Sequence, residues 1–417
     1  MDIREQMILK AEAAKRAADA MTMVSTVVKN KALLAMADRL EAESSRIIEA
    51  NKADLENAVA KGVRKSYMDR LMLDKKRIAG MADGLRQTAS LPDPVGEGDY
   101  ETVRPNGLEI RRIHVPLGVV GIIYEARPNV TSDAAGLCLK AGNAVILRGG
   151  SEAICSNKVI IGILQEAAYS NGIPEGTIQF VDFTDREAVN IMLRLNDYLD
   201  VIIPRGGAGL IKTVVENSSV PVIETGTGVC HTYVDEGADL DMALEIAVNA
   251  KVSRPSVCNA METLLINSKE APGFLPLLME RMTAEGCELR GCSRCMELAP
   301  DMKPAEELDW STEYGDLILS VKLVDDVNSA IEHINRYNTG HSEAIITNNV
   351  RNAHLFQRRV NASSVYVNAS TRFTDGCEFG FGAEIGISTQ KLHARGPMGL
   401  MALTSTKYLV YGEGHIR

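Results

Sequence analysis

The sequence predicts an α/β protein of two units with an added β arm. Apolar strand segments alternate with helical segments between residues 119 and 223, and the alternation returns between residues 232 and 367. Strands that are joined through helices favour right-handed crossovers and a parallel sheet covered on both faces. A hairpin signal near residue 106 and an alternating segment near the C-terminus predict β structure outside these two units.

The first 90 residues are expected to be helical, because apolar residues recur there at helical spacing. The segments that carry this spacing are 11–20, 31–50 and 69–88. The stretch Leu91-Pro-Asp-Pro-Val-Gly-Glu-Gly98 then ends the pattern. After it, Asn106-Gly107 separates the alternating segments 101–104 and 108–114, which is typical of a β-hairpin.

The two alternating units each predict a parallel sheet. The first is expected to have strands at 119–124, 144–148, 178–181, 201–203 and 220–223, and helices at 133–141, 151–170, 186–195 and about 208–217. The second is expected to have strands at 232–234, 263–266, 317–323, 344–347 and 364–367, and helices at 239–252, 272–285, 327–336 and 352–360.

The C-terminal segment 403–410 alternates like a strand but has no local partner. We expect it and the hairpin, about 98–115, to be arms that pair elsewhere, for example in another subunit. The predicted domains are therefore 1–224 with the hairpin arm, 225–395, and 396–417 as a C-terminal oligomerisation arm. Ligands of such sheets bind at the carboxyl ends of the strands.

Composition excludes several classes of protein. The 417 residues are 45% hydrophobic and 24% charged, as in ordinary globular proteins, and the net charge is −10. That charge argues against a general binder of nucleic acid or anionic membranes. No signal-peptide core or apolar run of transmembrane length is found, and the eight Cys have no regular spacing, so we expect a cytoplasmic protein with reduced thiols.

Cys287, Cys292 and Cys295 form the one cluster that suggests zinc. A structural zinc ion usually takes four ligands, and no fourth Cys or His lies nearby. We expect no metal, and favour a redox-inert surface loop.

Cys258 is the candidate nucleophile. It follows the helical segment 239–252 and a turn broken by Pro255, and it precedes the strand 263–266. Connections between packed elements concentrate functional residues, and the nearby Arg254 could favour the reactive thiolate. The competing interpretation is that Cys258 is a small buried apolar residue.

Three glycine-containing turns follow strands and suggest a nucleotide site. They are Val145-Ile-Leu-Arg-Gly-Gly150, Pro204-Arg-Gly-Gly-Ala-Gly209, which opens a helix, and Val222-Ile-Glu-Thr-Gly-Thr-Gly228. Glycine lets the backbone approach a ligand closely, and a helix N-terminus favours phosphate. The second turn is not a G-x-G-x-x-G sequence, so simple tight turns remain the alternative.

Together these motifs resemble the aldehyde dehydrogenase superfamily, in which a Glu at a strand end precedes a nucleophilic Cys. Within it, the chain is similar to the γ-glutamyl phosphate reductases over essentially its whole length. The motifs that carry this resemblance are Tyr124-Glu-Ala-Arg-Pro-Asn-Val130, Glu224-Thr-Gly-Thr-Gly-Val-Cys-His231, Ile331-Glu-His-Ile-Asn-Arg-Tyr-Asn-Thr-Gly-His-Ser-Glu343, Phe379-Gly-Phe-Gly-Ala-Glu-Ile-Gly-Ile387 and Leu392-His-Ala-Arg-Gly-Pro-Met-Gly399.

The resemblance implies an aldehyde-dehydrogenase-like fold, with a Rossmann-type cofactor domain and an α/β catalytic domain. It implies NADPH-dependent reduction of L-glutamyl 5-phosphate to glutamate 5-semialdehyde in proline biosynthesis, through a Cys258 thioester. Asn129 takes the family's oxyanion position, and Glu313 resembles the glutamate that holds the nicotinamide ribose. We expect Glu224 to orient the cofactor or modulate the thiol, rather than to activate water.

The resemblance also assigns the binding residues. A cation at Arg148 without an acid at Ser151 favours a 2′-phosphate, and hence NADPH, although a solvated Arg148 is the alternative. The expected cofactor residues are Arg148, Gly149, Ser151, Gly206, Gly207, Gly209, Glu224, Gly226 and Glu313. The expected substrate residues are Arg127, Arg254, Arg372 and Arg395 for the anionic groups, and Asp375 and Glu378 for the ammonium.

The implied partners are further copies of the chain and an upstream glutamate 5-kinase. Two competing functions remain: a hydrolytic aldehyde dehydrogenase with Glu224 as base, and a non-catalytic nucleotide-binding scaffold of the same fold. Phosphate dependence separates the first from the reductase. Substrate-protected alkylation of Cys258 that abolishes activity excludes the second.

Overall fold

The structure is a computed structural model that describes residues 2–62 and 65–417. It forms two compact units. The first comprises Met1–Thr225, Gly380–Gly386 and Met398–Arg417, and the second comprises Gly226–Phe379 and Ile387–Pro397. The first unit therefore includes the C-terminal strand.

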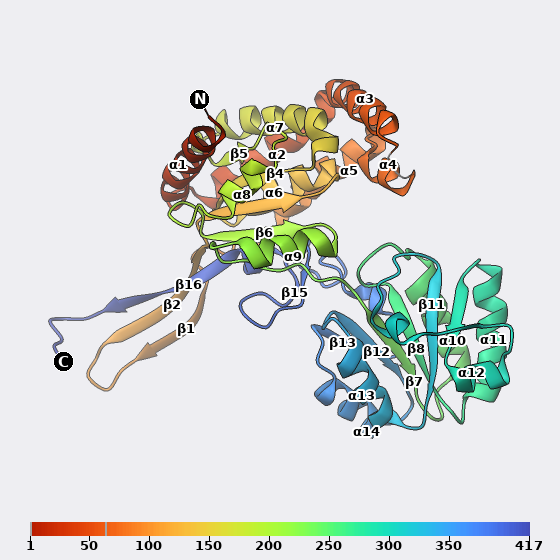
Figure 1. Ribbon diagram of the computed structural model, residues 1–417. Coiled ribbons are helices and arrows are strands. Elements are labelled where there is room, and N and C mark those ends of the chain that lie inside the picture. The colour runs from red at the N-terminus through yellow and green to blue at the C-terminus, as the bar shows by residue number, and fades with distance from the viewer. Residues whose placement is uncertain (1, 63–64) are drawn as a thin grey trace. The chain divides into compact units, whose positions relative to one another are not determined.

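A four-stranded parallel sheet forms the centre of the first unit (Figure 1). Its strands are β3 (Val119–Tyr124), β4 (Ala144–Arg148), β5 (Ile178–Phe180) and β6 (Val201–Arg205), in the order β5-β4-β3-β6. All six residues of β3 are buried, as expected for a strand that is covered on both faces. The connecting helices are α6 (Pro128–Lys140), α7 (Ile154–Tyr169), α8 (Glu187–Met192) and α9 (Ala208–Asn217).

Among the described residues, the helices that precede this sheet are α1 (Ile3–Met21), α2 (Thr26–Ala42), α3 (Ser44–Ala60), α4 (Lys65–Leu71) and α5 (Lys75–Ser90). A capping box between Asp2 and Glu5 begins α1, and Asp74 caps α5. The alanine-rich face of α1 packs with Val119 and Ile146 of the sheet. Helix α2 packs against α5 and α7 in the other layer. The predicted helical N-terminal region is confirmed.

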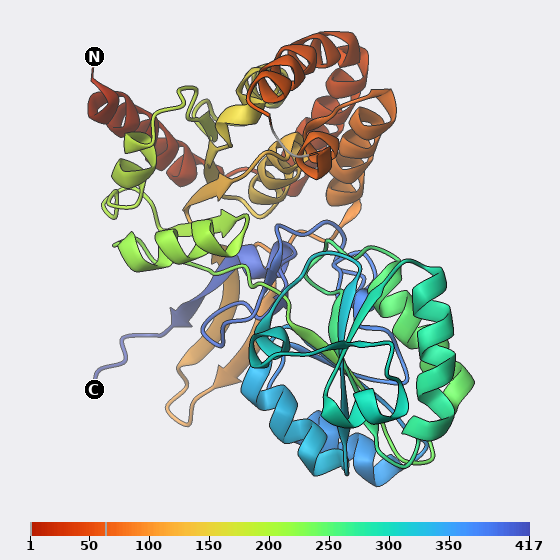
Figure 2. The same cartoon turned by 45° about the vertical axis from the view of Figure 1, so that its right-hand side comes forward.

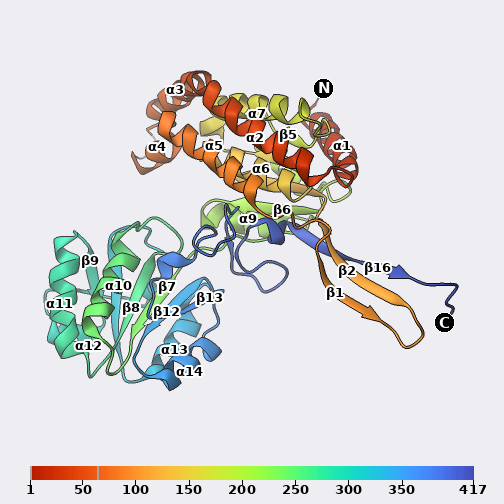
Figure 3. The same ribbon diagram turned by 180° about the vertical axis from the view of Figure 1, so that it is seen from behind.

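The arm is a three-stranded antiparallel sheet in the order β1-β2-β16 (Figure 3). It contains β1 (Gly98–Val103), β2 (Glu109–Pro116) and β16 (Thr404–Tyr411). The hairpin prediction is confirmed. The C-terminal strand does find a partner within its own chain, because Ser405–Tyr411 runs alongside β2 with Thr406 opposite His114.

The second unit contains a seven-stranded parallel sheet in the order β10-β9-β11-β8-β7-β12-β13. Its strands are β7 (Cys230–Val234), β8 (Met261–Asn267), β9 (Glu288–Gly291), β10 (Lys303–Pro304), β11 (Ile318–Val324), β12 (Ser342–Ile346) and β13 (Ser364–Val367). Alternate residues of β8 serve opposite faces: Leu264 and Ile266 enter one core, and Leu265 enters the other.

Helices cover both faces of this second sheet (Figure 2). One core contains side chains of α10 (Leu240–Val252), α11 (Ala271–Ala284) and α12 (Ser293–Leu298). The other contains side chains of α13 (Val327–Tyr337) and α14 (Val350–Arg359). Short elements complete the chain: β14 (Ile387–Ser388), β15 (Gly396–Pro397), and 3₁₀ turns at Ser151–Ala153, Glu307–Ser311, Thr371–Phe373 and Leu400–Leu403.

Two local predictions were wrong. The segment 220–223 forms no strand of the named sheets, and only an isolated bridge joins Val222 to Ile202. The cysteine cluster is not a surface loop: Cys287 and Cys295 are buried in the core beneath β11, where Cys295 Sγ donates to the Val321 carbonyl. Within the described residues, no helix is long and apolar enough to cross a membrane.

Candidate active site

Cys258 lies in the turn between α10 and β8, and its side chain is half-buried. Gly228 packs against its backbone. A Cβ on Gly228 would lie 1.4 Å from the Cys258 carbonyl oxygen and 2.4 Å from its carbonyl carbon. The thiol of Cys230 donates to the same oxygen, with a sulfur–oxygen distance of 3.2 Å. The backbone that carries the nucleophile is therefore fixed from two sides.

Gly228 also links Cys258 to Glu313. The Gly228 N–H donates to Glu313 Oε1 at 3.0 Å. Glu313 itself is exposed, on the segment between the 3₁₀ turn Glu307–Ser311 and β11. The glycine turn before β7 thus contacts both the nucleophile's backbone and the carboxylate that the sequence assigns to the cofactor. Sequence reasoning assigned Glu224 and Gly226 from this turn, but it missed the role of Gly228.

Cationic side chains of the second unit gather beside Cys258. The Arg372 Nε donates to Ser253 Oγ at 3.1 Å, and its terminal nitrogen donates to Asn259 Oδ1. Burial lowers the pKa of Arg372, the charge of Arg254 lowers it further, and the charge of Cys258 raises it. The three predicted residues Arg254, Arg372 and Cys258 are therefore electrostatic neighbours.

Asn259 holds this cluster together, although sequence reasoning did not find it. Its Nδ2 donates to the Arg372 and Thr374 carbonyls at 3.2 and 3.0 Å. In return, Thr371 Oγ1 donates to the Asn259 carbonyl at 2.7 Å. The residue after the nucleophile therefore ties the segment 371–374 to the Cys258 turn.

The other predicted substrate residues of this unit are less closely grouped. Asp375 interacts electrostatically with Arg372, and its Oδ1 accepts the N–H groups of Cys377 and Glu378. Arg395 is exposed and donates to Asn361 Oδ1 at 3.0 Å. Asp375 thus belongs to the Arg372 cluster, whereas Arg395 lies beside the segment that follows α14.

Arg148 ends β4 in the first unit and is half-buried. Its guanidinium donates to the Gly149 carbonyl at 3.0 Å, and its buried Nε has no hydrogen-bond partner among the described residues. Burial lowers the pKa of Arg148, while Glu152 raises it and the charge of Arg186 lowers it. A half-buried guanidinium with an unused donor, near a second cation, fits an anionic group such as a 2′-phosphate.

The glycines of this unit allow close packing. A Cβ on Gly149 would lie 2.4 Å from Asn157 Nδ2, and one on Gly206 would lie 2.7 Å from the Glu125 carboxylate carbon. Glu125 Oε1 accepts the Gly207 N–H at 3.0 Å, at the start of α9. Glu125, in the motif after β3, was another residue that sequence reasoning left unassigned.

Ser151 begins the 3₁₀ turn that follows Gly150, and a Cβ on Gly209 would meet no atom within 4 Å. Arg127 precedes α6 and is half-buried. Asn129 lies exposed in the first turn of α6, where its Nδ2 donates to Asp133 at 3.2 Å. Glu224 is half-buried and lies beside Thr225, the last residue of the first of the three segments that make up the first unit.

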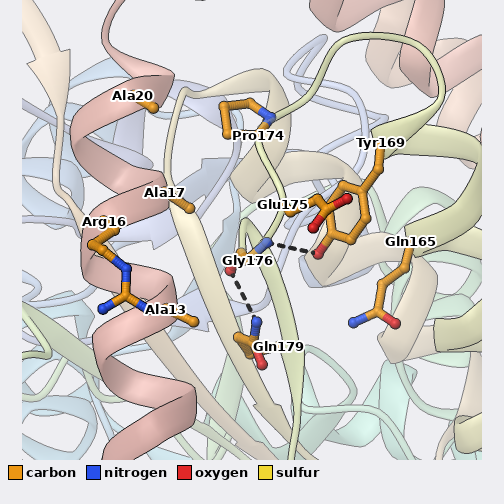
Figure 4. Close-up of a pocket in the computed structure, with 10 residues that line it drawn as sticks. All are labelled: Ala13, Arg16, Ala17, Ala20, Gln165, Tyr169, Pro174, Glu175, Gly176 and Gln179. Atoms are coloured by element: carbon orange, nitrogen blue, oxygen red, sulfur yellow. Dashed lines mark hydrogen bonds between the residues drawn. The ribbon is translucent and has the colours of Figure 1, made fainter.

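A pocket of about 510 Å³ lies elsewhere in the first unit, between α1, α7 and the segment before β5 (Figure 4). Two of its polar side chains bond to the protein backbone: Tyr169 Oη accepts the Gly176 N–H, and Gln179 donates to the Gly176 carbonyl. None of the predicted site residues lines it. No group of three metal-ligating side chains is found in the described part of the chain.

Comparison with known proteins defines the class. The model of the aldehyde dehydrogenase family matches residues 3–286 and 310–408. An acetylating aldehyde dehydrogenase from Geobacillus thermoglucosidasius has the same fold, with a TM-score of 0.73 at 17% identity over 100% of this chain and 98% of its own. The chain belongs to the aldehyde dehydrogenase family, whose fold includes a nucleotide-binding domain.

More similar relatives narrow this class. A γ-glutamyl phosphate reductase of Moorella thermoacetica is 59% identical over 417 residues, which is 100% of both chains. A crystal structure of the γ-glutamyl phosphate reductase from Thermotoga maritima is 50% identical, with a TM-score of 0.97, and each chain covers 99% of the other. The resemblance that the sequence motifs indicated is confirmed.

Proposed function

We propose that this protein reduces L-glutamyl 5-phosphate to L-glutamate 5-semialdehyde with NADPH and releases phosphate, through a thioester on Cys258. The observation that carries the proposal is the Cys258 turn, held by Gly228 and Cys230 and flanked by Arg254 and Arg372. The relatives described above bear the name of this enzyme. The reaction would serve proline biosynthesis, in the cytoplasm.

Cys258 would act as a covalent nucleophile. Its thiolate attacks the acyl carbon, the carbon–oxygen bond to phosphate breaks, and phosphate leaves with the electron pair. Nearby cations favour a thiolate over a thiol, and guanidinium groups bind carboxylate and phosphate in two-pronged geometry. Arg254 and Arg372 can therefore stabilise the thiolate and bind the anionic groups of the substrate. We assign the substrate ammonium group to Asp375 and Glu378. Arg127 and Arg395 remain further candidates for the anionic groups.

Each tetrahedral state at the acyl carbon carries an oxyanion. The backbone N–H of Cys258 is a candidate donor, because Gly228 and Cys230 fix that backbone from its carbonyl side. We assign the second donor to the side-chain amide of Asn129. Fixed donors stabilise developing charge without reorganisation during the reaction.

The cofactor would supply a hydride to the thioester carbonyl, after which Cys258 sulfur leaves and the aldehyde is released. Arg148, with its unused buried Nε, supports a 2′-phosphate and hence NADPH. Glu313, held by the Gly228 N–H, is our candidate for the nicotinamide ribose. We assign the same cofactor to Gly149, Ser151, Gly206, Gly207, Gly209, Glu224 and Gly226.

Glu224 would orient the cofactor or modulate the thiol. A base that activated water would hydrolyse the thioester before it was reduced, which would waste the intermediate. The hydrolytic alternative predicts the opposite role for Glu224. If Glu224→Gln abolished phosphate-dependent turnover in both directions while cofactor binding stayed intact, the orienting role would be wrong.

The reverse reaction tests the proposal. Glutamate 5-semialdehyde and NADP are mixed with the wild type, with and without phosphate, and NADPH is followed by its absorbance. We expect turnover that requires phosphate and is lost in Cys258→Ala. Equal turnover without phosphate would favour the hydrolytic alternative, and no turnover with unimpaired NADPH binding would favour a scaffold.

The exposed arm suggests association with further copies of the chain. Its strands carry exposed aromatic and aliphatic side chains, including Tyr100, Val103, Tyr408 and Val410. Exposed apolar patches of this kind often mark protein interfaces. We propose a homo-oligomer, and an upstream glutamate 5-kinase as a candidate partner that would deliver the labile acyl phosphate.

A further inference from the structure

A buried ion pair lies behind the Glu313 segment, and the proposed chemistry does not use it. Lys251 at the end of α10 and Glu262 in β8 have fully buried side chains, with 2.6 Å between Nζ and Oε2. Removing two charges from water costs free energy, and this cost offsets much of the attraction between them. Stability alone is therefore a poor explanation for a buried ion pair. Its contacts indicate what else it does.

The second oxygen of Glu262 reaches the surface segment that carries Glu313. Glu262 Oε1 accepts the Gly315 N–H at 3.2 Å. Gly315 has a φ of +61°, a left-handed conformation that favours glycine, so the chain turns sharply there. Burial raises the pKa of Glu262 to about 7, Lys251 lowers it, and the charge of Glu313 contributes to raising it. Glu262 and Glu313 are therefore electrostatically coupled.

Tyr314, between Glu313 and Gly315, is held by the same cluster. Lys251 Nζ lies 5.7 Å from the centre of its ring, and the Arg290 guanidinium lies 5.2 Å from it. A cation is attracted to the π face of a nearby aromatic ring, so both cations help to hold the Tyr314 ring. The Tyr314 hydroxyl donates to Asp309 at 2.7 Å and lies 2.8 Å from Ser320 Oγ. The two residues that follow Glu313 are thus fixed by buried groups.

We infer that the Lys251–Glu262 pair positions Glu313 for the cofactor. Lys251 holds Glu262, Glu262 holds the Gly315 N–H, and this fixes the surface segment so that Glu313 receives the Gly228 N–H. The inference deepens the proposed function and depends on Glu313 binding the cofactor. Lys251 and Glu262 act through Glu313, so both are positioning residues.

Two double variants test this inference. Both remove the two charges, but only one keeps an acceptor for the Gly315 N–H: Lys251→Met with Glu262→Gln keeps it, and Lys251→Met with Glu262→Met loses it. The dissociation constant of NADPH is measured by fluorescence without substrate, together with the alkylation rate of Cys258. We expect about tenfold weaker binding for the Met/Met variant, binding within about threefold of wild type for the Met/Gln variant, and an unchanged alkylation rate in both.

The pair Lys29–Asp93 provides the matched control. It is also buried, with 2.5 Å between Nζ and Oδ2, but it lies in the first unit outside the residues assigned to the cofactor. Lys29→Met with Asp93→Asn should lower the melting temperature and leave NADPH binding unchanged. If the Met/Met variant does not fold, Tyr314→Phe replaces it, and at least about threefold weaker binding is expected.

The outcomes separate this inference from the proposed function. Glu313→Gln is measured in parallel and should weaken NADPH binding. If it does, and the Met/Met variant (or Tyr314→Phe in its place) binds NADPH like the wild type, the positioning role is overturned while the proposed function stands. Equal weakening of NADPH binding in the Met/Met and Met/Gln variants would also overturn the positioning role. The side-chain oxygen at position 262 that accepts the Gly315 N–H would then make no difference to cofactor binding. If Glu313→Gln binds NADPH like the wild type, both the cofactor role of Glu313 and the positioning role fail.

Discussion

Replacing Gly228 with alanine should disable the nucleophile without changing any reactive group. The added Cβ would lie 1.4 Å from the Cys258 carbonyl oxygen, and real Cβ contacts essentially never fall under 3.0 Å. The Cys258 turn or the glycine turn must therefore move by about 1.6 Å, the difference between these two distances (3.0 − 1.4). A misplacement of about 1 Å can reduce a rate about 100-fold.

We therefore expect kcat/KM in the phosphate-dependent assay to fall at least about 100-fold, which corresponds to about 2.7 kcal/mol of transition-state stabilisation. The backbone of Gly228 does not have a positive φ, so the obstacle is the Cys258 carbonyl and not the conformation of residue 228. Single-turnover reduction and alkylation of Cys258 would show whether the thiol is misplaced.

Gly273→Ala is the matched control. Gly273 lies in α11 of the same unit, and its added Cβ would be 3.6 Å from Leu240, an ordinary contact. That variant should keep wild-type activity. The reasoning would be refuted if Gly228→Ala kept more than a third of the wild-type kcat/KM with an unchanged alkylation rate of Cys258.

Three further predictions concern charged groups. Arg148→Ala should weaken NADPH binding about 10- to 100-fold and leave NADH binding nearly unchanged, because one charge-assisted contact to the 2′-phosphate is lost. Binding titrations with both nucleotides check this, and the variant of an exposed arginine, Arg194→Ala, is the control. An equal loss of affinity for both nucleotides would contradict the prediction. Arg372→Lys should raise the KM for phosphate in the reverse reaction about tenfold, because lysine cannot bind phosphate through two parallel donors; an unchanged KM would remove Arg372 from the phosphate site. Glu262 should titrate near pH 7, since burial raises its pKa from the ordinary value of 4.5. The folded state therefore binds the Glu262 proton more tightly than the unfolded state does. This difference contributes about 3 kcal/mol to the free energy of unfolding below the unfolded-state pKa of about 4.5, and the contribution is lost as the pH rises through the folded-state pKa of about 7. Infrared difference spectra should show a protonated carboxyl band that disappears near pH 7 and is absent in Glu262→Gln, and a band unaffected by that substitution would contradict the assignment.

Most of the fold could be predicted because its strands are continuous apolar runs. All six residues of β3 and all seven of β8 are buried, and short apolar runs between helical segments are typical of parallel strands covered on both faces. The segment 220–223 also has an apolar pattern, but Pro221 has no N–H to donate, and only a bridge through Val222 forms. Strands β9 and β10 escaped prediction because they are short and carry charged residues such as Arg290 and Lys303.

The site was predictable where residues are close in sequence or carry a motif. Arg254 and Cys258 are four positions apart, and the resemblance to the family supplied Arg372. The contacts of Gly228, Asn259 and Glu262 depend instead on how the α10–β8 crossover meets other segments. One local signal did exist: a glutamate inside the apolar run of β8 must find a partner if it is buried. Its partner Lys251 lies on a helix, and no spacing rule connects the two.

The covalent intermediate provides the most direct test of the central claim. Wild-type protein is mixed with glutamate 5-semialdehyde and NADP in the absence of phosphate, quenched with acid, and examined by intact-mass and peptide mass spectrometry. We predict one acyl group per chain on Cys258, which disappears when phosphate is added before the quench, and no adduct in Cys258→Ala. An adduct on another residue, or continued turnover without phosphate, would contradict the account.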